Sequence, residues 1–188
     1  MSVWSELVRL CDAFVEEHPV VSDVETVGTL MRRLEPHLKA LRMNAEELPY
    51  GRYLLHGDEQ GRYNIQLDVF SMDYEGSIHS HDTWGLMWVL KGSLYISNWN
   101  KQESGFQMLC DMITTAGSGN CFCPPISDWH KVITPKDGPQ PVSLHFYGPG
   151  FDLDEGTYVN SDFEVVQGRR SPFKSNEVFL PHLTSELV

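Results

Sequence analysis

The chain has 188 residues, of which 41% are hydrophobic and 21% charged, as is ordinary for a soluble globular protein with one full-sized core. Its net charge of −12 argues against nucleic acid or an anionic membrane surface as partner. No apolar run reaches the roughly 18 residues of a spanning helix, and the first residues lack a signal-peptide pattern. We therefore expect one domain over residues 1–188, in the cytoplasm, as a monomer or small homo-oligomer.

The four cysteines do not make a disulfide framework for a chain of this length, so we expect reduced thiols. Cys121 and Cys123 form a C-x-C pair, which could indicate a thiolate metal site. Because no second pair accompanies it, cysteines packed in the core are the favoured interpretation.

Two helices are predicted in residues 1–45. Apolar residues between positions 3 and 17 recur with helical spacing, and His18-Pro19 ends the run because the residue before proline avoids the α conformation. Residues 22–25 form a capping box from Ser22 to Glu25, which starts a second apolar stripe running to Leu38. His18 and His37 lie near the ends of these helices, and we expect them at the surface or in caps.

From about residue 50 the pattern changes to short runs rich in β-branched and aromatic residues, separated by turn residues. Strands are predicted within 53–55, 63–70, 86–90, 93–99, 107–109, 120–123, 130–133 and 141–147. Many short strands at close spacing indicate a mostly β sandwich or barrel, with its core in residues 50–152. Residues 153–188 contain strand candidates and loops that the pattern does not place.

Two histidines of one short segment, His79 and His81, are two residues apart, and His130 follows 49 positions later. In a strand this spacing puts both imidazoles of the pair on one face. Three imidazoles suit a first-row divalent metal and leave coordination positions for other ligands. The alternative is that the pair arises by chance and that each histidine is structural.

The spacing around these histidines resembles the two signature motifs of the cupin superfamily, which implies a small jelly-roll barrel. The first motif would comprise Gly76, His79, His81, Gly85 and Gly92, and the second Gly119, Pro125 and His130. Gly76 lies closer to His79 than is usual, and Ser127 and Thr134 replace a glycine and an asparagine.

Many cupins carry a glutamate ligand where this chain has Gly85, so three neutral histidines remain. That ligand set resembles the thiol dioxygenases, and cysteine dioxygenase in particular. The likeness runs from about residue 50 to 152, and its segments are 50–52, 77–81, 128–132 and 143–152.

Ser143, His145 and Tyr147 alternate along one predicted strand, so their side chains share a face. A Ser–His–Tyr chain can orient the phenol beside a metal-bound substrate. The alternative for His145 is an ordinary core histidine. Cysteine dioxygenases of the mammalian type crosslink this tyrosine to a cysteine near the first motif. This chain has none there, so we expect Tyr147 to be uncrosslinked.

The resemblance implies that His79, His81 and His130 hold Fe(2+) and that the chain converts L-cysteine with O2 to cysteine sulfinic acid. Arg52 would grip the substrate carboxylate, Tyr50 would line its pocket, and Tyr147 would hydrogen-bond the bound oxygen or substrate.

Three alternatives stay open. One is a dioxygenase of 3-mercaptopropionate, mercaptosuccinate or another thiol acid, the second a cupin that binds without turnover, and the third a metal cupin enzyme that needs no oxygen. Trp84 and Trp88 could shape the pocket or pack in the core, and no role is predicted for His56 or His182.

Overall fold

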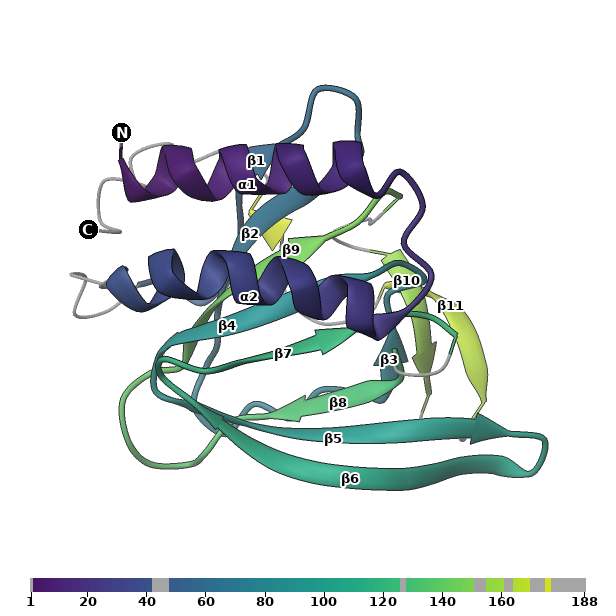
Figure 1. The fold of residues 1–188 in the computed structure, drawn as a ribbon. Coiled ribbons are helices and arrows are strands. Elements are labelled where there is room, and N and C mark those ends of the chain that lie inside the picture. Colours follow the sequence, from purple (N-terminus) through teal and green to yellow (C-terminus); the bar gives the residue numbers. More distant parts are fainter. Residues whose placement is uncertain are drawn as a thin grey trace.

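A computed structural model describes residues 2–41, 48–125, 128–150, 155–160, 164–169 and 175–176. Two helices, α1 (Val3–Glu17) and α2 (Val24–Ala40), lie side by side across one face of a β-structure (Figure 1). The strands that follow are β1 (Gly51–Gly57), β2 (Asn64–Val69), β3 (His79–Ser80), β4 (Gly85–Lys91), β5 (Ser93–Gln102), β6 (Gly105–Thr115), β7 (Gly119–Phe122), β8 (His130–Ile133), β9 (Val142–Tyr147), β10 (Glu155–Val159), β11 (Val165–Arg169) and β12 (Ser175–Asn176).

The helices begin and end at local capping groups. Helix α1 ends at His18, immediately before Pro19, as the sequence predicts. Helix α2 begins one residue later than the predicted capping box, because Asp23 and not Ser22 is its N-cap. The Asp23 carboxylate accepts from the backbone N–H of Thr26 at 2.7 Å and from its hydroxyl at 2.9 Å. A carboxylate also complements the positive end of the helix dipole, which a serine hydroxyl does not.

The strand order is that of a jelly roll. One sheet runs β12-β1-β2-β9-β4-β7 and the other β11-β10-β3-β8-β5-β6. From β2 to β9 the chain alternates between the sheets, except that β5 and β6 pair within the second one, so each sheet has four strands of the jelly roll. Strands β1 and β12 extend the first sheet, and β10 and β11 extend the second. The predicted fold class, a mostly β cupin-type barrel with N-terminal helices, is confirmed, and each predicted run overlaps a strand.

The first sheet has two chemically different faces. Alternate residues such as Ile65, Leu67 and Leu144 pack with the helices in one apolar core. Their neighbours Gln66 and His145 point to the opposite face, into the barrel. An apolar cluster fills part of that interior, and its buried members are Phe70, Met87, Val89, Leu94, Ile96 and Val132.

Trp84 and Trp88 belong to the core between the helices and the sheet, where they are 5% and 3% exposed. Trp84 packs edge-on against Phe14 of α1, with ring centroids 5.4 Å apart. Core packing therefore accounts for both tryptophans.

All four cysteines carry free thiols. Cys11 and Cys123 are buried in the core that the helices cover, and burial raises the pKa of both thiols. Burial also raises the pKa of Cys121 to about 11. These cysteines are packing residues rather than thiolate ligands. Within the described residues, no helix combines the length and the apolar character that a membrane crossing requires.

Candidate metal centre

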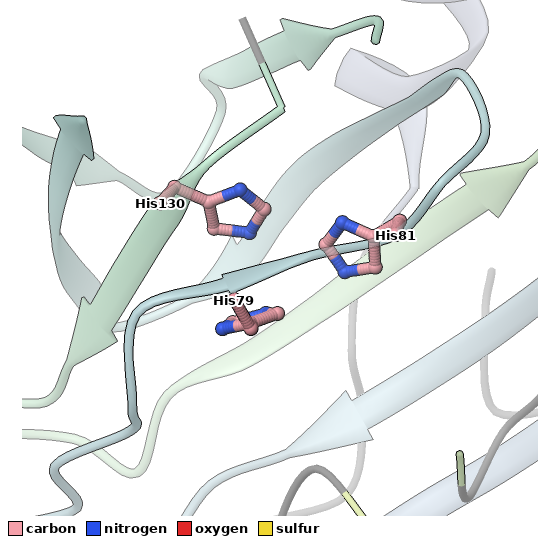
Figure 2. Close-up of side chains that lie close together, drawn as sticks. All are labelled: His79, His81 and His130. Carbon is pink, nitrogen blue, oxygen red and sulfur yellow. The ribbon is translucent and has the colours of Figure 1, made fainter. Parts of the chain in front are cut away.

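Three buried histidines meet inside the barrel (Figure 2). His79 lies on β3 directly opposite His130 on β8, and His81 follows β3 by one residue. Their ring centroids are 4.5 to 4.9 Å apart, and one nitrogen from each lies within 4.8 Å of the others. Strand β3 is only two residues long, so His81 lies just past its end, where its backbone N–H donates to the Asp128 carboxylate.

Hydrogen bonds at Nδ1 orient all three rings. His79 Nδ1 lies 2.9 Å from the Ser77 carbonyl, and His130 Nδ1 lies 2.7 Å from the Asp128 carbonyl. His81 Nδ1 lies 3.3 Å from the carboxylate of Asp128. A carbonyl oxygen can only accept, so Nδ1 carries the proton in His79 and His130, and the carboxylate favours the same tautomer in His81. The lone pairs are then on the Nε2 atoms, and this donor set fits a divalent first-row metal.

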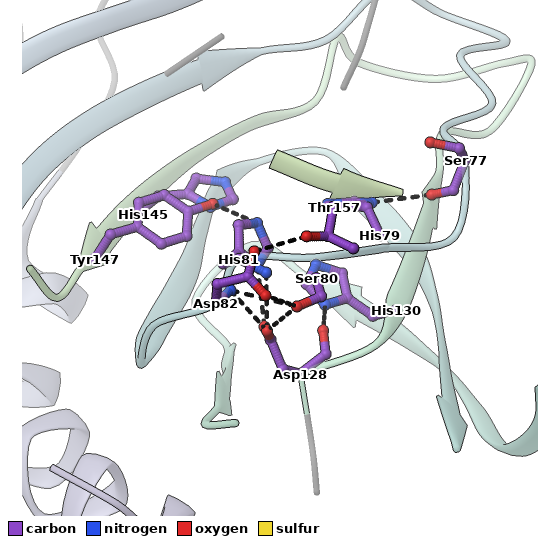
Figure 3. A network of polar contacts seen from close by, with 10 residues as sticks. All are labelled: Ser77, His79, Ser80, His81, Asp82, Asp128, His130, His145, Tyr147 and Thr157. Atoms are coloured by element: carbon purple, nitrogen blue, oxygen red, sulfur yellow. Dashed lines mark hydrogen bonds and ion pairs between the residues drawn. The ribbon is translucent and has the colours of Figure 1, made fainter. Parts of the chain in front are cut away.

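The Asp128 carboxylate ties the two histidine segments together (Figure 3). It is 1% exposed and accepts from the Ser80 hydroxyl at 2.5 Å, the His81 N–H at 2.8 Å and the Asp82 N–H at 3.0 Å. Asp82, which has a positive φ of 56°, turns the chain after His81 and also accepts from Thr157 on β10. The sequence pattern predicts no role for Asp128, although this residue lies only two positions before His130.

Gly85 leaves no room for a fourth protein ligand at its position. A Cβ there would lie 2.3 Å from Cζ of Phe122, which is opposite Gly85 in the β4–β7 pair. The Phe122 ring instead stacks on His81, with centroids 4.6 Å apart. A phenyl ring therefore stands where a carboxylate side chain on residue 85 would have to pass.

Three side chains on β9 form a hydrogen-bonded chain that ends at the cluster, and Figure 3 shows two of them, His145 and Tyr147. The Ser143 hydroxyl lies 2.7 Å from His145 Nε2, and His145 Nδ1 lies 2.9 Å from the Tyr147 hydroxyl. That hydroxyl lies 3.3 Å from Nε2 of His81. Burial lowers the pKa of His145 to about 4, with Asp68 opposing and Arg52 adding to the shift, so this imidazole is neutral near pH 7.

Arg52 is buried at 8% exposure on β1 and faces the barrel interior. Its Nε donates to Asp68 on β2 at 3.1 Å. Burial alone would lower the pKa of Arg52, but the Asp68 carboxylate raises it above its ordinary value, so the guanidinium is charged. Tyr50 precedes β1 and is 37% exposed; burial and nearby Tyr74 raise its pKa.

The remaining predicted positions lie elsewhere. His56 contacts the Tyr63 hydroxyl at 3.3 Å and is not part of the cluster. Ser127, Asp152 and His182 lie outside the described residues. In the part of the chain that the structure describes, the three histidines are the one group of metal-binding side chains that comes together.

The fold and the cluster define a jelly-roll barrel of the cupin type with a candidate three-histidine metal centre. No protein-family model matches the sequence. Similar solved structures include a recombinant oxalate oxidase in complex with glycolate, with 14% identity over 57% of this chain and a TM-score of 0.42. The chain covers 56% of that oxidase, little more than half of its length.

Two RmlC-like cupins are also similar. One is from Shewanella frigidimarina, with 18% identity over 56% of this chain and 82% of that one and a TM-score of 0.40. The other is from Ralstonia eutropha, with 12% identity over 74% of this chain and 88% of that one and a TM-score of 0.45. Because these sequence identities and TM-scores are low, we assign the fold class from the strand order. Any inference about chemistry is drawn from this chain's own residues.

Proposed function

We propose that this protein is an Fe(2+)-dependent dioxygenase that converts a small thiol carboxylic acid, L-cysteine in the first place, to its sulfinate. The observation that carries the proposal is the hydrogen-bonded chain from Ser143 through His145 to Tyr147, which ends beside His81. It stands next to three histidines without a carboxylate ligand, as the resemblance to thiol dioxygenases requires.

His79, His81 and His130 would hold the iron through Nε2. Bound there, Fe(2+) would activate the substrate thiolate and dioxygen, and both oxygen atoms would be transferred to the substrate sulfur. Because the three ligands are neutral, the full 2+ charge is available to attract an anion such as a thiolate. Asp128 keeps the His81 and His130 rings aimed at one point through its carboxylate and carbonyl oxygens.

Tyr147 would donate or accept a hydrogen bond at the reacting group. A neutral His145 has one N–H, so it can accept from Ser143 and donate to Tyr147, and the phenol proton is then directed toward the metal centre. The Ser143 side chain fixes the His145 ring at the far end. Phe122 shields the Tyr147 side of the centre, with its ring centroid 5.7 Å from the Tyr147 ring.

Arg52 would bind the substrate carboxylate, with Tyr50 at the edge of the same region. A guanidinium presents its N–H donors in a planar fork that can bond both oxygens of one carboxylate, and Asp68, which accepts from Nε, holds the Arg52 side chain in place. The substrate carboxylate would bind the fork, and its thiol would then extend toward the histidines.

The first experiment is oxygen uptake by anaerobically Fe(2+)-loaded protein with L-cysteine, 3-mercaptopropionate, mercaptosuccinate and cysteamine. We expect uptake with a thiol acid, matched by an equal amount of its sulfinate. No uptake with any of the four at full iron occupancy would contradict the proposal and favour a binding cupin or a metal enzyme that needs no oxygen.

The variant Arg52→Lys tests the carboxylate role without leaving Asp68 beside an uncharged side chain. Lysine retains the charge but loses the fork, so KM for L-cysteine should rise about tenfold or more. KM for cysteamine, which lacks the carboxylate, should change little. Arg62→Lys, in the Arg62–Asp58 pair outside the barrel, is the matched control. Equal changes for both thiols would remove Arg52 from the substrate site.

A further inference from the structure

The inward-facing side chains of strand β5 become more exposed toward the end of that strand. Leu94 and Ile96 are 0% and 2% exposed and belong to the apolar cluster inside the barrel. Asn98, two residues further along the same face, is half-buried, and Asn100 beyond it is exposed. The pairing of β5 with β8 ends at Asn98, after which only the ladder between β5 and β6 continues (Figure 1). Asn98 therefore lies where the closed part of the barrel opens.

Asn98 also lies in the same row of the second sheet as two of the candidate metal ligands. It is directly opposite His130, His130 is opposite His79, and His79 is opposite Tyr158 on β10. Residues that are opposite each other in antiparallel strands present their side chains to the same face, with Cβ atoms about 4.5 to 5.5 Å apart. Asn98 and Tyr158 therefore flank the two histidines on that face, one on each side.

The exposure of this row is lowest at the histidines and rises on both sides. His130 and His79 are 7% and 9% exposed, whereas Asn98 and Tyr158 are half-buried. The two flanking residues are polar, and neither belongs to the three-histidine group. Partly exposed polar side chains beside buried ligands indicate a path from solvent to the ligands.

The other sides of the centre are closed by buried side chains. Phe122, which is 4% exposed, stacks on His81, and Tyr147, which is 2% exposed, reaches His81 from the first sheet. The apolar cluster fills the barrel next to the row of histidines. In the part of the chain that the structure describes, the open side of the centre is thus the one that Asn98 and Tyr158 border.

We propose that metal and substrate reach the three histidines between Asn98 and Tyr158, and that these two side chains limit the size of the thiol acid that the site admits. Three strand spacings separate the two residues, about 14 Å between their backbones, and both side chains narrow that gap. The position of this entrance follows from the fold, and only the identity of the admitted ligand rests on the proposed function.

An entrance affects rates and not equilibria. A bulkier side chain on the path raises the barrier equally for entry and for exit, so both rates fall while the affinity, which depends only on the free and bound states, is retained. A residue that instead shapes the metal site changes the affinity. The two roles are therefore separable by kinetics.

The test is stopped-flow measurement of Fe(2+) uptake and release under anaerobic conditions, with a chromogenic chelator as reporter. In Asn98→Trp both rates should fall about tenfold, and the affinity should change by less than about threefold. Asn98→Ala and Tyr158→Ala should each accelerate both rates. Ile113→Trp adds a similar bulk on β6 at a residue that is 60% exposed, and this matched control should keep wild-type rates.

Wild-type rates in all three variants would overturn the entrance. Faster release without slower uptake in Asn98→Trp would also overturn it, because that result assigns the residue to the metal site itself. If Asn98→Trp does not fold, the two alanine variants decide the question by the same pair of rates, since they only remove atoms at half-buried positions.

Thiol binding separates the entrance from the dioxygenase activity. In anaerobic titrations of iron-loaded protein, wild type should bind L-cysteine at least about tenfold more tightly than glutathione, a bulkier thiol acid. The double variant Asn98→Ala/Tyr158→Ala should reduce that ratio to about threefold or less, and an unchanged ratio would overturn size selection. Faster iron exchange in the alanine variants with no binding of either thiol would support the entrance and contradict the thiol dioxygenase. Oxygen uptake with L-cysteine and unchanged iron-exchange rates would do the reverse.

Discussion

At the scale of single residues, Asp128 does more for the candidate metal centre than its place outside the three histidines suggests. Its carboxylate accepts from the His81 backbone and faces the His81 ring, while its carbonyl faces the His130 ring. Partners of this kind set the tautomer and the aim of a ligand, and their loss commonly weakens metal binding 10- to 100-fold.

Asp128→Asn should therefore weaken iron binding by roughly 10- to 100-fold while the protein stays folded. Competition with a chromogenic chelator would measure the affinity. Asp58→Asn, which removes a largely buried carboxylate far from the histidines in sequence, should leave it unchanged. An Asp128→Asn protein with wild-type iron affinity would show that the three rings need no help from this carboxylate.

His145 is the residue whose protonation links stability to pH. Its pKa in the fold is about 4 against an ordinary 6.5, because burial, Arg52 and His130 disfavour the cation more than Asp68 favours it. A lowered histidine pKa means that the unfolded chain takes up the proton first. The native state is therefore fully stabilised above about pH 6.5 and loses that contribution as the pH falls toward 4.

Between pH 7 and pH 4, metal-free wild-type protein should thus lose up to about 3 kcal/mol more unfolding free energy than His145→Asn, whose amide does not titrate. Urea denaturation at a series of pH values measures both curves, and all other titrating groups are common to them. Parallel curves would mean that His145 is not held neutral by the fold.

At the scale of elements, the pairing of β4 with β7 shapes the centre. Gly85 lies opposite Phe122, and the absence of a side chain at residue 85 lets the Phe122 ring lie over His81. Strands β4 and β7 must approach closely here for the Phe122 ring to reach the histidines. Gly85 is therefore required because it has no side chain, and not because of its backbone conformation.

Gly85→Ala should lower the free energy of unfolding by about 1 to 3 kcal/mol and weaken iron binding, because the added methyl group displaces Phe122. Thermal denaturation and chelator competition measure the two effects. Adding Phe122→Leu should recover part of the stability. Gly57→Ala is the control, since a Cβ at Gly57 meets no atom within 4 Å. A Gly85→Ala protein as stable as that control would contradict the proposed close approach.

At the scale of the whole molecule, the centre joins segments that are distant in sequence. His79 and His130 are brought together by the β3–β8 pair, and Tyr147 reaches His81 from the opposite sheet. A metal ion would bind the native state selectively, because the unfolded chain does not hold the three histidines together. It should therefore stabilise the native state in proportion to the logarithm of its concentration.

Saturation with Fe(2+) under anaerobic conditions should raise the melting temperature, with about 2.7 kcal/mol of added stability at a hundredfold excess over Kd. Scanning calorimetry across an iron series would show the shift. His79→Ala, His81→Ala and His130→Ala should each remove it, whereas His56→Ala should not. A variant that retained the full shift would exclude its histidine from the ligand set.

The sequence by itself determined the local parts of this protein. Helical spacing placed α1 and α2, and alternating and apolar runs placed the strands. The positions of His79, His81 and His130 indicated that the three side chains bind one metal ion. These properties are readable because they depend on neighbours within a few residues, which set the face and the period of an element.

Only the tertiary structure decided what covers each face of a strand. Polar Gln66 and Asp68 alternate with apolar Ile65 and Leu67, a pattern typical of a strand with one face in water. Here the helices cover the apolar face, and the polar face lines the barrel. The partner of Asp68 on β1 and its neighbour Ser143 on β9 follow from strand register across the sheet. No local pattern encodes such long-range pairing, and so the contacts of Asp68, Asp128 and Phe122 emerged from the fold alone.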